Sequence, residues 1–151
     1  MTPGPDRDVA GIEHELTLLS RHFVHAAPRT ELALDRSGYL LLGRLELEQP
    51  MTLRGLAEAF RLDQSTINRQ VAALRREGLV ERIADPEGGP AHVYRPTTEG
   101  LRRLRSDRAR MQQGIDLVIG SWPGAERADL HRLLVKLNAG IEGLEGRPWP
   151  R

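Results

Sequence analysis

Residues 64–76 combine groups that can recognise base edges and phosphates of a nucleic acid. If the segment is a helix, Ile67, Val71 and Leu74 share one side, because they are spaced by four and three residues. The opposite side then carries Ser65, Arg69, Ala72 and Arg76, with Thr66 and Asn68 at the flanks. Small residues let a helix approach the major groove closely, and hydroxyl, amide and guanidinium groups pair with base edges or phosphates. The segment is therefore a candidate for reading DNA.

A polar outer face is also typical of any amphipathic surface helix, so this pattern alone favours a solvated face. The charge distribution points the other way. Residues 51–110 carry 12 basic and 8 acidic side chains, whereas residues 1–50 carry 5 and 8, and residues 111–151 carry 5 and 5. All basic residues except Lys136 are arginines, whose planar fork suits phosphates and guanine edges. Together with the neighbouring elements, this positive middle segment favours DNA binding.

The neighbouring elements are predicted from periodicity and from cap residues. The first predicted helix covers 36–48; it turns Leu41, Leu42 and Leu45 inward and ends before Gln49-Pro50. The second covers 53–60 and is capped by Thr52. The third has Asp63 or Gln64 near its N-cap and Gly78 after its end. Two β-prone stretches, 79–84 and 91–95, flank a turn-rich tip and predict a hairpin. A short helix, a tight turn, a second helix and a hairpin make a winged helix-turn-helix.

Longer amphipathic helices flank this unit. One covers about 9–27, and the C-terminal helices lie within 98–145 and begin after Thr97. A winged unit of about 50 residues cannot bury their apolar stripes alone, whereas two packed subunits can. The alternative is that the stripes pack only within the chain. The residues predicted to hold such a dimer are Ile12, Leu16, Leu19, Leu104, Leu130, Leu134, Leu137 and Ile141. A dimer also presents twin reading helices about one DNA turn apart, which suits a pseudo-palindromic site.

The predicted fold class is therefore mainly α with a small β-hairpin wing. We expect a single domain over residues 9–145, with its winged helix-turn-helix core at about 36–100 between N- and C-terminal dimerisation helices. Residues 1–8 are expected to form a flexible N-terminal tail and residues 146–151 a loose C-terminal tail, because both are polar or rich in helix breakers.

Composition excludes several other classes. With 39% hydrophobic and 28% charged residues, the 151-residue chain can build a core, and no apolar run approaches the roughly 20 residues that a membrane helix needs. The start of the chain has no apolar signal-peptide core, so we expect a cytoplasmic protein. The absence of cysteine excludes disulfides, a thiolate nucleophile and Cys-ligated metals. Since the motifs of phosphate loops, serine hydrolases and zinc proteases are also missing, we expect neither an enzyme nor a bound cofactor.

Histidines near the N-terminus leave one metal hypothesis open. His22 and His25, three residues apart on a predicted helix, could share a zinc ion. Glu13, Glu15 or His131 would have to complete the usual four ligands. The alternative is that these histidines lie on the surface or line a pocket, and we favour it because nothing in the sequence brings the other ligands together.

Several motifs of the central segment resemble the MarR family of bacterial regulators. They are residues 53–60 (LRGLAEAF), 62–71 (LDQSTINRQV), 74–82 (LRREGLVER), Asp85-Pro86-Glu87 at the start of the wing, and 97–100 (TTEG). The motifs agree in order and spacing, and the resemblance in length and element order extends over nearly the whole chain.

The resemblance implies a homodimer whose two winged lobes bind duplex DNA, usually as a repressor. It also implies release by a small, often aromatic or phenolic, effector bound between the dimer helices and the lobe. By position, the residues implied to face the major groove are Gln64, Ser65, Thr66, Asn68 and Arg69; those implied to contact phosphates are Arg54 and Arg75; and Arg82 would support the wing.

The wing departs from the family pattern. Gly88, Gly89 and Pro90 stand where the family usually has an aspartate, an arginine and a second basic residue. His92 and Arg95 are the nearest substitutes for a minor-groove cation. We therefore expect weaker or less A·T-dependent binding than in a typical member. The alternative function is a protein-interaction module, or a degenerate regulator with weak, non-specific DNA binding.

Overall fold

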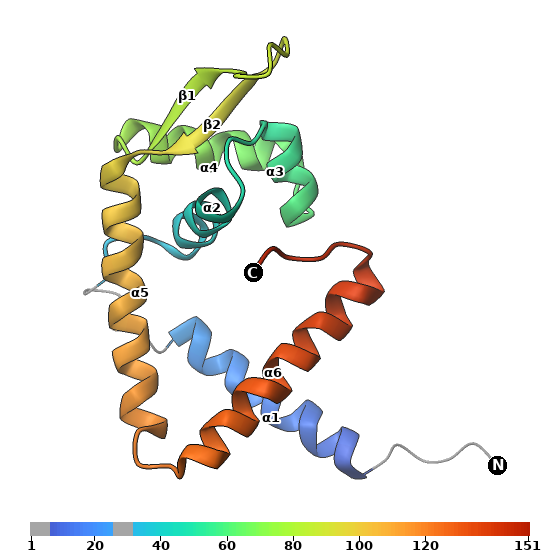
Figure 1. The fold of residues 1–151 in the computed structure, drawn as a ribbon. Helices are drawn as coiled ribbons and strands as arrows, with labels where there is room; N and C mark the ends of the chain where they lie inside the picture. The colour runs from blue at the N-terminus through green and yellow to red at the C-terminus, as the bar shows by residue number, and fades with distance from the viewer. Residues whose placement is uncertain (1–6, 26–31) are drawn as a thin grey trace, which may run out of the picture. The chain divides into compact units, whose positions relative to one another are not determined.

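The computed structural model describes residues 7–25 and 32–151, which form two compact units (Figure 1). The first unit ends at Leu32 and contains helix α1 (Arg7–His25), in which the side chains of residues 8–21 are described. The second unit contains α2 (Arg36–Leu47), α3 (Leu53–Phe60), α4 (Gln64–Arg76), β1 (Val80–Ala84), β2 (His92–Pro96), α5 (Thr98–Ile119) and α6 (Gly124–Glu145). The predicted order of helices and strands, and with it the winged-helix fold class, is confirmed.

Short polar side chains start the helices of the second unit, as their sequence predicts. Thr52, Asp63 and Thr97 each accept a hydrogen bond from the backbone N–H three residues later, at 2.9, 2.8 and 3.0 Å. Each bond satisfies an N–H group that has no partner inside the helix. Asp63, not Gln64, is the N-cap of α4, and Gly78 follows that helix with φ +71°, a left-handed conformation that favours glycine.

Helix α2 runs through the centre of the core. Leu41, Leu42 and Leu45 are at most 1% exposed, and α2 packs against α4, α5 and β2. The predicted inner face of α4 is buried as well. The core is completed by residues of α3, α4, the hairpin and α5, and of the segments that join them: Leu34, Met51, Leu56, Ala57, Ile67, Val71, Leu74, Leu79, Val80, Tyr94 and Leu104.

Leu104 corrects the predicted dimer interface. Its side chain is fully buried in the core of its own unit, so it has no surface to offer a second subunit. The apolar stripe of α5 divides in two, because only the first turns of α5 lie against the winged lobe. Farther along, Ile115 and Val118 are 50% and 69% exposed. The sequence showed the stripe but not the point at which the helix leaves the core.

A segment outside the two strands also pairs with the hairpin and joins it to the rest of the lobe. Strands β1 and β2 are antiparallel, with Val80 opposite Pro96 and Ala84 opposite His92. Met51 bridges to Tyr94 through two backbone hydrogen bonds of 3.0 and 2.8 Å. Because Tyr94 is also buried, the base of the wing is held by both its backbone and its inner face.

The C-terminal segment 146–151 differs from the expected loose tail. The Trp149 ring meets Phe60 edge to face, with 5.3 Å between ring centroids, and the guanidinium carbon of Arg44 lies 4.6 Å from the indole centroid. The sequence misses this contact because helix breakers show only that regular structure ends, not where the following residues go.

Candidate nucleic-acid interface

Helices α3 and α4 form a tight helix-turn-helix. Arg61 ends α3 in a left-handed conformation, with φ 54°, and the Leu62 N–H donates to the Ala57 carbonyl at 3.1 Å. This turn and the buried side of α4 direct the remaining faces of α4 outward (Figure 1). The exposed side of α4 is thus presented by its own packing, as a helix that enters a DNA groove must be.

The N-terminal turn of α4 holds a connected group of polar side chains. Asp63 accepts hydrogen bonds from the Ser65 hydroxyl and, at 2.8 Å, from the Thr66 hydroxyl. The Arg69 guanidinium donates to the Thr66 oxygen at 3.2 Å. The structure therefore brings together three of the predicted DNA-contacting residues, and Asp63, which the sequence assigned only to capping, organises them.

The same bonds hold a negative charge at this end of the helix. Hydrogen bonds from the Ser65 hydroxyl and then from the Thr66 backbone and hydroxyl hold the pKa of Asp63 well below its usual range. The start of a helix can offer free N–H groups to a phosphate, but the Thr66 N–H of α4 already donates to Asp63. A phosphate is also repelled by this carboxylate, so phosphate contacts are better sought elsewhere.

Other predicted contacts lie on a different flank of α4 and on α3. Gln64, Asn68 and Arg75 are all exposed, and helical spacing puts them in one row along the helix. Arg54, on the first turn of α3, pairs with Glu58 at 3.1 Å between side chains that are 82% and 62% exposed. A pair so exposed contributes little to stability, so a phosphate can displace Glu58 at small cost.

Not every basic side chain of the hairpin is equally available to contact DNA. Arg82 and His92 are exposed, as a DNA-contacting role requires. Arg95 instead donates to Glu81 on the neighbouring strand, at 2.6 Å. Arg95 therefore meets DNA already paired with a carboxylate, whereas the exposed His92 lies at the outer end of β2, nearer the tip of the wing.

The glycines at the tip of the wing have a local structural cause. Asp85 closes the turn, because its carboxylate accepts the Glu87 N–H at 3.0 Å and its carbonyl accepts the Gly88 N–H at 2.9 Å. Gly88 has φ +81°, and a Cβ on Gly89 would lie 2.3 Å from the Asp85 carboxylate. A larger residue at Gly89 would require the Asp85 side chain to move, and the backbone conformation at Gly88 favours glycine, so the present tip suits both glycines.

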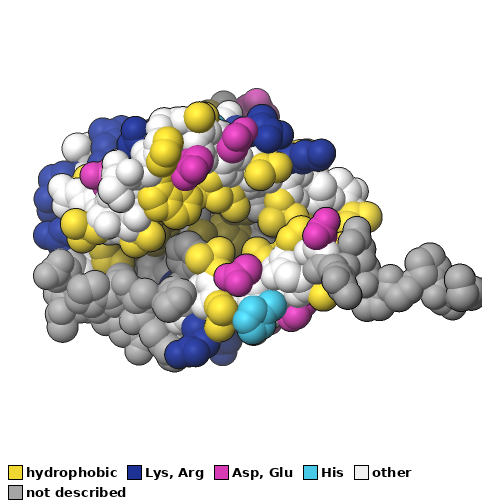
Figure 2. All heavy atoms as spheres, turned by 90° about the horizontal axis from the view of Figure 1, so that it is seen from below, with side chains coloured by type: hydrophobic (Ala, Val, Ile, Leu, Met, Phe, Trp, Pro, Cys, Tyr) yellow, Lys and Arg dark blue, Asp and Glu magenta, His cyan; other side chains and the backbone are white. Residues whose placement is uncertain are grey.

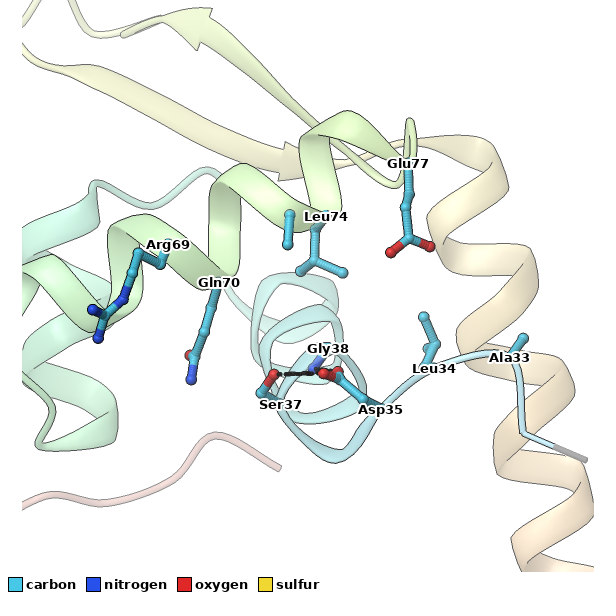
Figure 3. Close-up of a pocket in the computed structure, with 10 residues that line it drawn as sticks. Ala33, Leu34, Asp35, Ser37, Gly38, Arg69, Gln70, Leu74 and Glu77 are labelled. Atoms are coloured by element: carbon cyan, nitrogen blue, oxygen red, sulfur yellow. Dashed lines mark hydrogen bonds between the residues drawn. The ribbon is translucent and has the colours of Figure 1, made fainter. Parts of the chain in front are cut away.

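A cavity of about 330 Å³ borders the other flank of α4 (Figure 3). Arg69 and Gln70 line it from α4, opposite Asp35 and Ser37 at the start of α2. The Asp35 carboxylate already accepts the N–H of Gly38 at 2.7 Å, so its first role is to cap α2. Sequence reasoning missed this cavity because it depends on how two helices cross. Arg69 lies at the rim between the cavity and the outer face of α4.

The described residues do not test the metal hypothesis. Among them, no group of three or more His, Cys, Asp or Glu side chains is arranged to hold a metal ion. The side chains of His22 and His25 lie outside the described residues, so the proposed zinc pair remains a hypothesis. In the same described part of the chain, no helix has both the length and the apolar character needed to cross a membrane.

Comparisons with known proteins agree with the arrangement of the lobe. The model of the MarR family matches residues 34–88. YxaD of Bacillus subtilis (strain 168), an HTH-type transcriptional regulator, is 33% identical over 129 residues, covering 84% of this chain and 90% of YxaD. A MarR family protein from Bacillus stearothermophilus superposes with a TM-score of 0.80 at 23% identity, over 89% of this chain and 96% of its own.

A second solved structure with a similar fold is that of a regulator that responds to a small molecule. BpsR of Bordetella bronchiseptica, whose DNA binding is regulated by 6-hydroxynicotinic acid, superposes with a TM-score of 0.64 at 22% identity, over 89% of this chain and 97% of its own. Below 25% identity this likeness supports the fold alone. The family match, the identity with YxaD and the winged lobe together identify the chain as a member of the MarR family of DNA-binding transcriptional regulators.

Proposed function

We propose that this regulator binds a pseudo-palindromic operator as a homodimer and represses transcription until a small effector releases it. The observation that carries the proposal is the exposed face of α4. There, a preformed group at Ser65, Thr66 and Arg69 lies beside the exposed amides of Gln64 and Asn68. These groups can pair with donors and acceptors in the major groove, while Arg54, Arg75 and Arg82 supply charge for the DNA backbone.

Exposed apolar side chains support a homodimer. In α6, Leu134, Leu137 and Ile141 are 41%, 38% and 46% exposed, and α6 contributes no residue to the core. In α1, considered by itself, Ile12, Leu16 and Leu19 lie along one stripe and are 55%, 41% and 42% exposed. Leu130, in the first half of α6, is half-buried. Figure 2 shows hydrophobic side chains open to the surface on the face seen from below. Such surface on a regulator is well explained by a second copy of the chain.

The effector we propose is a small aromatic or phenolic compound. The regulation of BpsR by 6-hydroxynicotinic acid supports this class, because BpsR shares the fold. Binding that favours one spacing of the two lobes would shift the population away from the spacing that fits successive major grooves. A thermal-shift screen of aromatic acids and phenols, followed by DNA binding with each hit, tests this part of the proposal.

A protein-interaction role is the second candidate, and the wing favours it. Its tip carries no cation, and Arg95 is neutralised by Glu81. A regulator that relied on minor-groove contacts would be weakened by this wing. The DNA-binding experiment below separates the two functions.

Replacing Arg69 by alanine is expected to weaken specific binding by about 1–3 kcal/mol, because one base-reading guanidinium is lost. Fluorescence anisotropy on duplex DNA from upstream of the protein's own gene, at 50 and 200 mM salt, measures the change. Arg75→Ala should instead weaken binding to all duplexes alike and reduce the salt dependence, as expected for a phosphate contact.

Arg127→Ala, an exposed change on α6, is the matched control and should bind like the parent protein. If Arg69→Ala keeps full affinity and preference, the role assigned to Arg69 is wrong. Equal, weak binding of the parent protein to operator and unrelated duplexes would favour the protein-interaction role.

The variant Leu137→Asp is expected to convert the dimer into folded monomers. Because Leu137 is partly exposed in the single chain, a carboxylate there costs the fold little but opposes burial against a second copy. Sedimentation velocity gives the mass, and circular dichroism verifies that the helices remain. Lys136→Asp, the neighbouring exposed position, is the control for the charge itself. A Leu137→Asp protein that still sediments as a dimer would refute this interface.

A further inference from the structure

The last residues of the chain return to the winged lobe and end in an aromatic contact. The indole of Trp149 meets the Phe60 ring at an interplanar angle of 80°, and the Arg44 guanidinium carbon lies 4.6 Å from the indole centroid. Edge-to-face rings and a cation over an aromatic face are both attractive arrangements. Trp149 thereby joins the C-terminal segment to α2 and α3 at once.

Polar contacts on both sides hold the segment in this position. Arg147 donates to the carbonyl of Glu58 in the last turn of α3, and Arg61 pairs with Glu145 at 3.0 Å. At the α6 end, the Glu142 carboxylate accepts a hydrogen bond from the backbone N–H of Trp149 at 3.1 Å and pairs with Arg151 at 2.7 Å. The contacts of residues 146–151 therefore link the end of α6 to the corner formed by α2 and α3.

Arg44 gives a physical reason for Trp149 to be there. Arg44 is only 9% exposed, and its Nε has no hydrogen-bond partner among the described residues. In the part of the chain that the structure describes, its ion pair is with Glu48, at 2.6 Å. A buried guanidinium with incomplete pairing is costly, and the face of an indole offsets part of that cost. The corner is thus prepared for an aromatic ring, and the chain supplies one.

We propose that residues 146–151 form a strap, anchored by Trp149, that fastens the end of α6 to the lobe and so limits movement of the lobe relative to the dimer helices. The role rests on the proposed function, in which α6 takes part in a dimer. Without the strap, α6 is joined to the lobe through α5, and α6 contributes no residue to the core. With it, the lobe is held at a second point.

The strap has a direct consequence for DNA binding. Two lobes that meet successive major grooves must have a defined spacing, and lobes free to move lose conformational freedom when they bind. A strap that restrains them in advance reduces that loss. Release of Trp149 is therefore expected to weaken binding to a duplex that contacts both lobes.

The first test detects docking of the strap without DNA. The chain has two tryptophans, so Trp122→Phe leaves Trp149 as the single tryptophan in the full-length protein, and its emission can be excited selectively over that of the two tyrosines. We expect its emission to be blue-shifted and partly protected from acrylamide, and to move towards that of the unfolded protein when Arg44→Gln is added. Free-tryptophan emission in the Trp122→Phe protein, or no change on adding Arg44→Gln, would overturn the proposed anchor.

The second test measures the consequence. Trp149→Ala should weaken binding to the two-lobe duplex by about fivefold, whereas Trp149→Phe, which keeps a ring over Arg44, should retain most of the affinity. The Trp122→Phe protein is the control, and sedimentation must show the same mass for all variants. Unchanged affinity in Trp149→Ala would remove the restraining role even if the strap docks. If the parent protein binds no duplex, the proposed function fails, while the fluorescence result still decides whether Trp149 docks.

Discussion

Gly100→Ala is expected to destabilise the protein by about 3 kcal/mol or more, because the new methyl group has no room. A Cβ at this position would lie 2.1 Å from the carbonyl oxygen of Leu79 and 3.2 Å from a methyl group of Leu42. The first contact is with backbone, which cannot rotate away. To relieve it, the first turn of α5 must separate from the segment that leads into the hairpin. The bond from the Thr97 N–H to the Leu79 oxygen, now 3.0 Å, would then be lengthened or lost.

Thermal unfolding followed by circular dichroism measures the effect. For a chain of this size, the loss corresponds to a decrease of about 6–12 °C in the melting temperature. Gly143→Ala is the matched control. It also lies in a helix, and a Cβ there meets nothing within 4 Å, so the change should be neutral or stabilising by a few tenths of a kcal/mol. If Gly100→Ala melts like the control, the close packing of α5 on the hairpin is not as the structure has it.

Local signals explain why the order of elements could be predicted from sequence. Thr52 and Thr97 are cap residues whose partners lie three positions away, and Gly78 adopts the left-handed conformation that its position after a helix suggested. The inner faces of α2 and α4 likewise follow from helical spacing. Each of these features depends on residues close in the chain, so it can be read without knowing the fold.

Features that depend on contacts between distant residues could not be predicted in the same way. Leu104 continues the apolar stripe of α5, and only the fold shows that it belongs to the core and not to a dimer interface. The position of Trp149 depends on Arg44, more than one hundred residues earlier. Periodicity identifies which side of a helix is apolar, but it does not identify what covers that side.

The candidate DNA interface shows the same division. The residue types and their exposure on α4 were predictable, because an amphipathic helix with a known inner face has a known outer face. Their mutual bonds were not: Asp63 binds the hydroxyl groups of Ser65 and Thr66, and Glu81 binds Arg95. These pairings change what each group can offer to DNA. A hydroxyl that donates to Asp63 approaches a base as an acceptor, and an arginine paired with a carboxylate attracts phosphate less strongly.

Asp107→Ala is expected to cost about 3 kcal/mol of stability, an effect unusual for a charged residue. Asp107 is fully buried, and its two oxygens accept the backbone N–H groups of Ala33 and Leu34 at 3.0 and 2.9 Å. Hydrogen bonds to a charged group contribute about 1.5–3 kcal/mol each, and alanine would leave the buried Leu34 N–H without a partner. Ala33 and Leu34 lead into α2, so the loss of their hydrogen bonds to Asp107 also loosens the start of this central helix.

Urea unfolding at neutral pH measures the change, with Asp116→Ala, an exposed aspartate on the same helix, as the control within about 0.5 kcal/mol of the parent protein. Asp107→Asn should fall between the two, because its amide oxygen can still accept one of the two N–H groups while its amide nitrogen faces the other. This order separates acceptance of the two backbone bonds from simple filling of space. Equal losses in Asp107→Ala and Asp107→Asn would mean that the negative charge itself, and not the number of accepted bonds, holds α5 to the segment before α2.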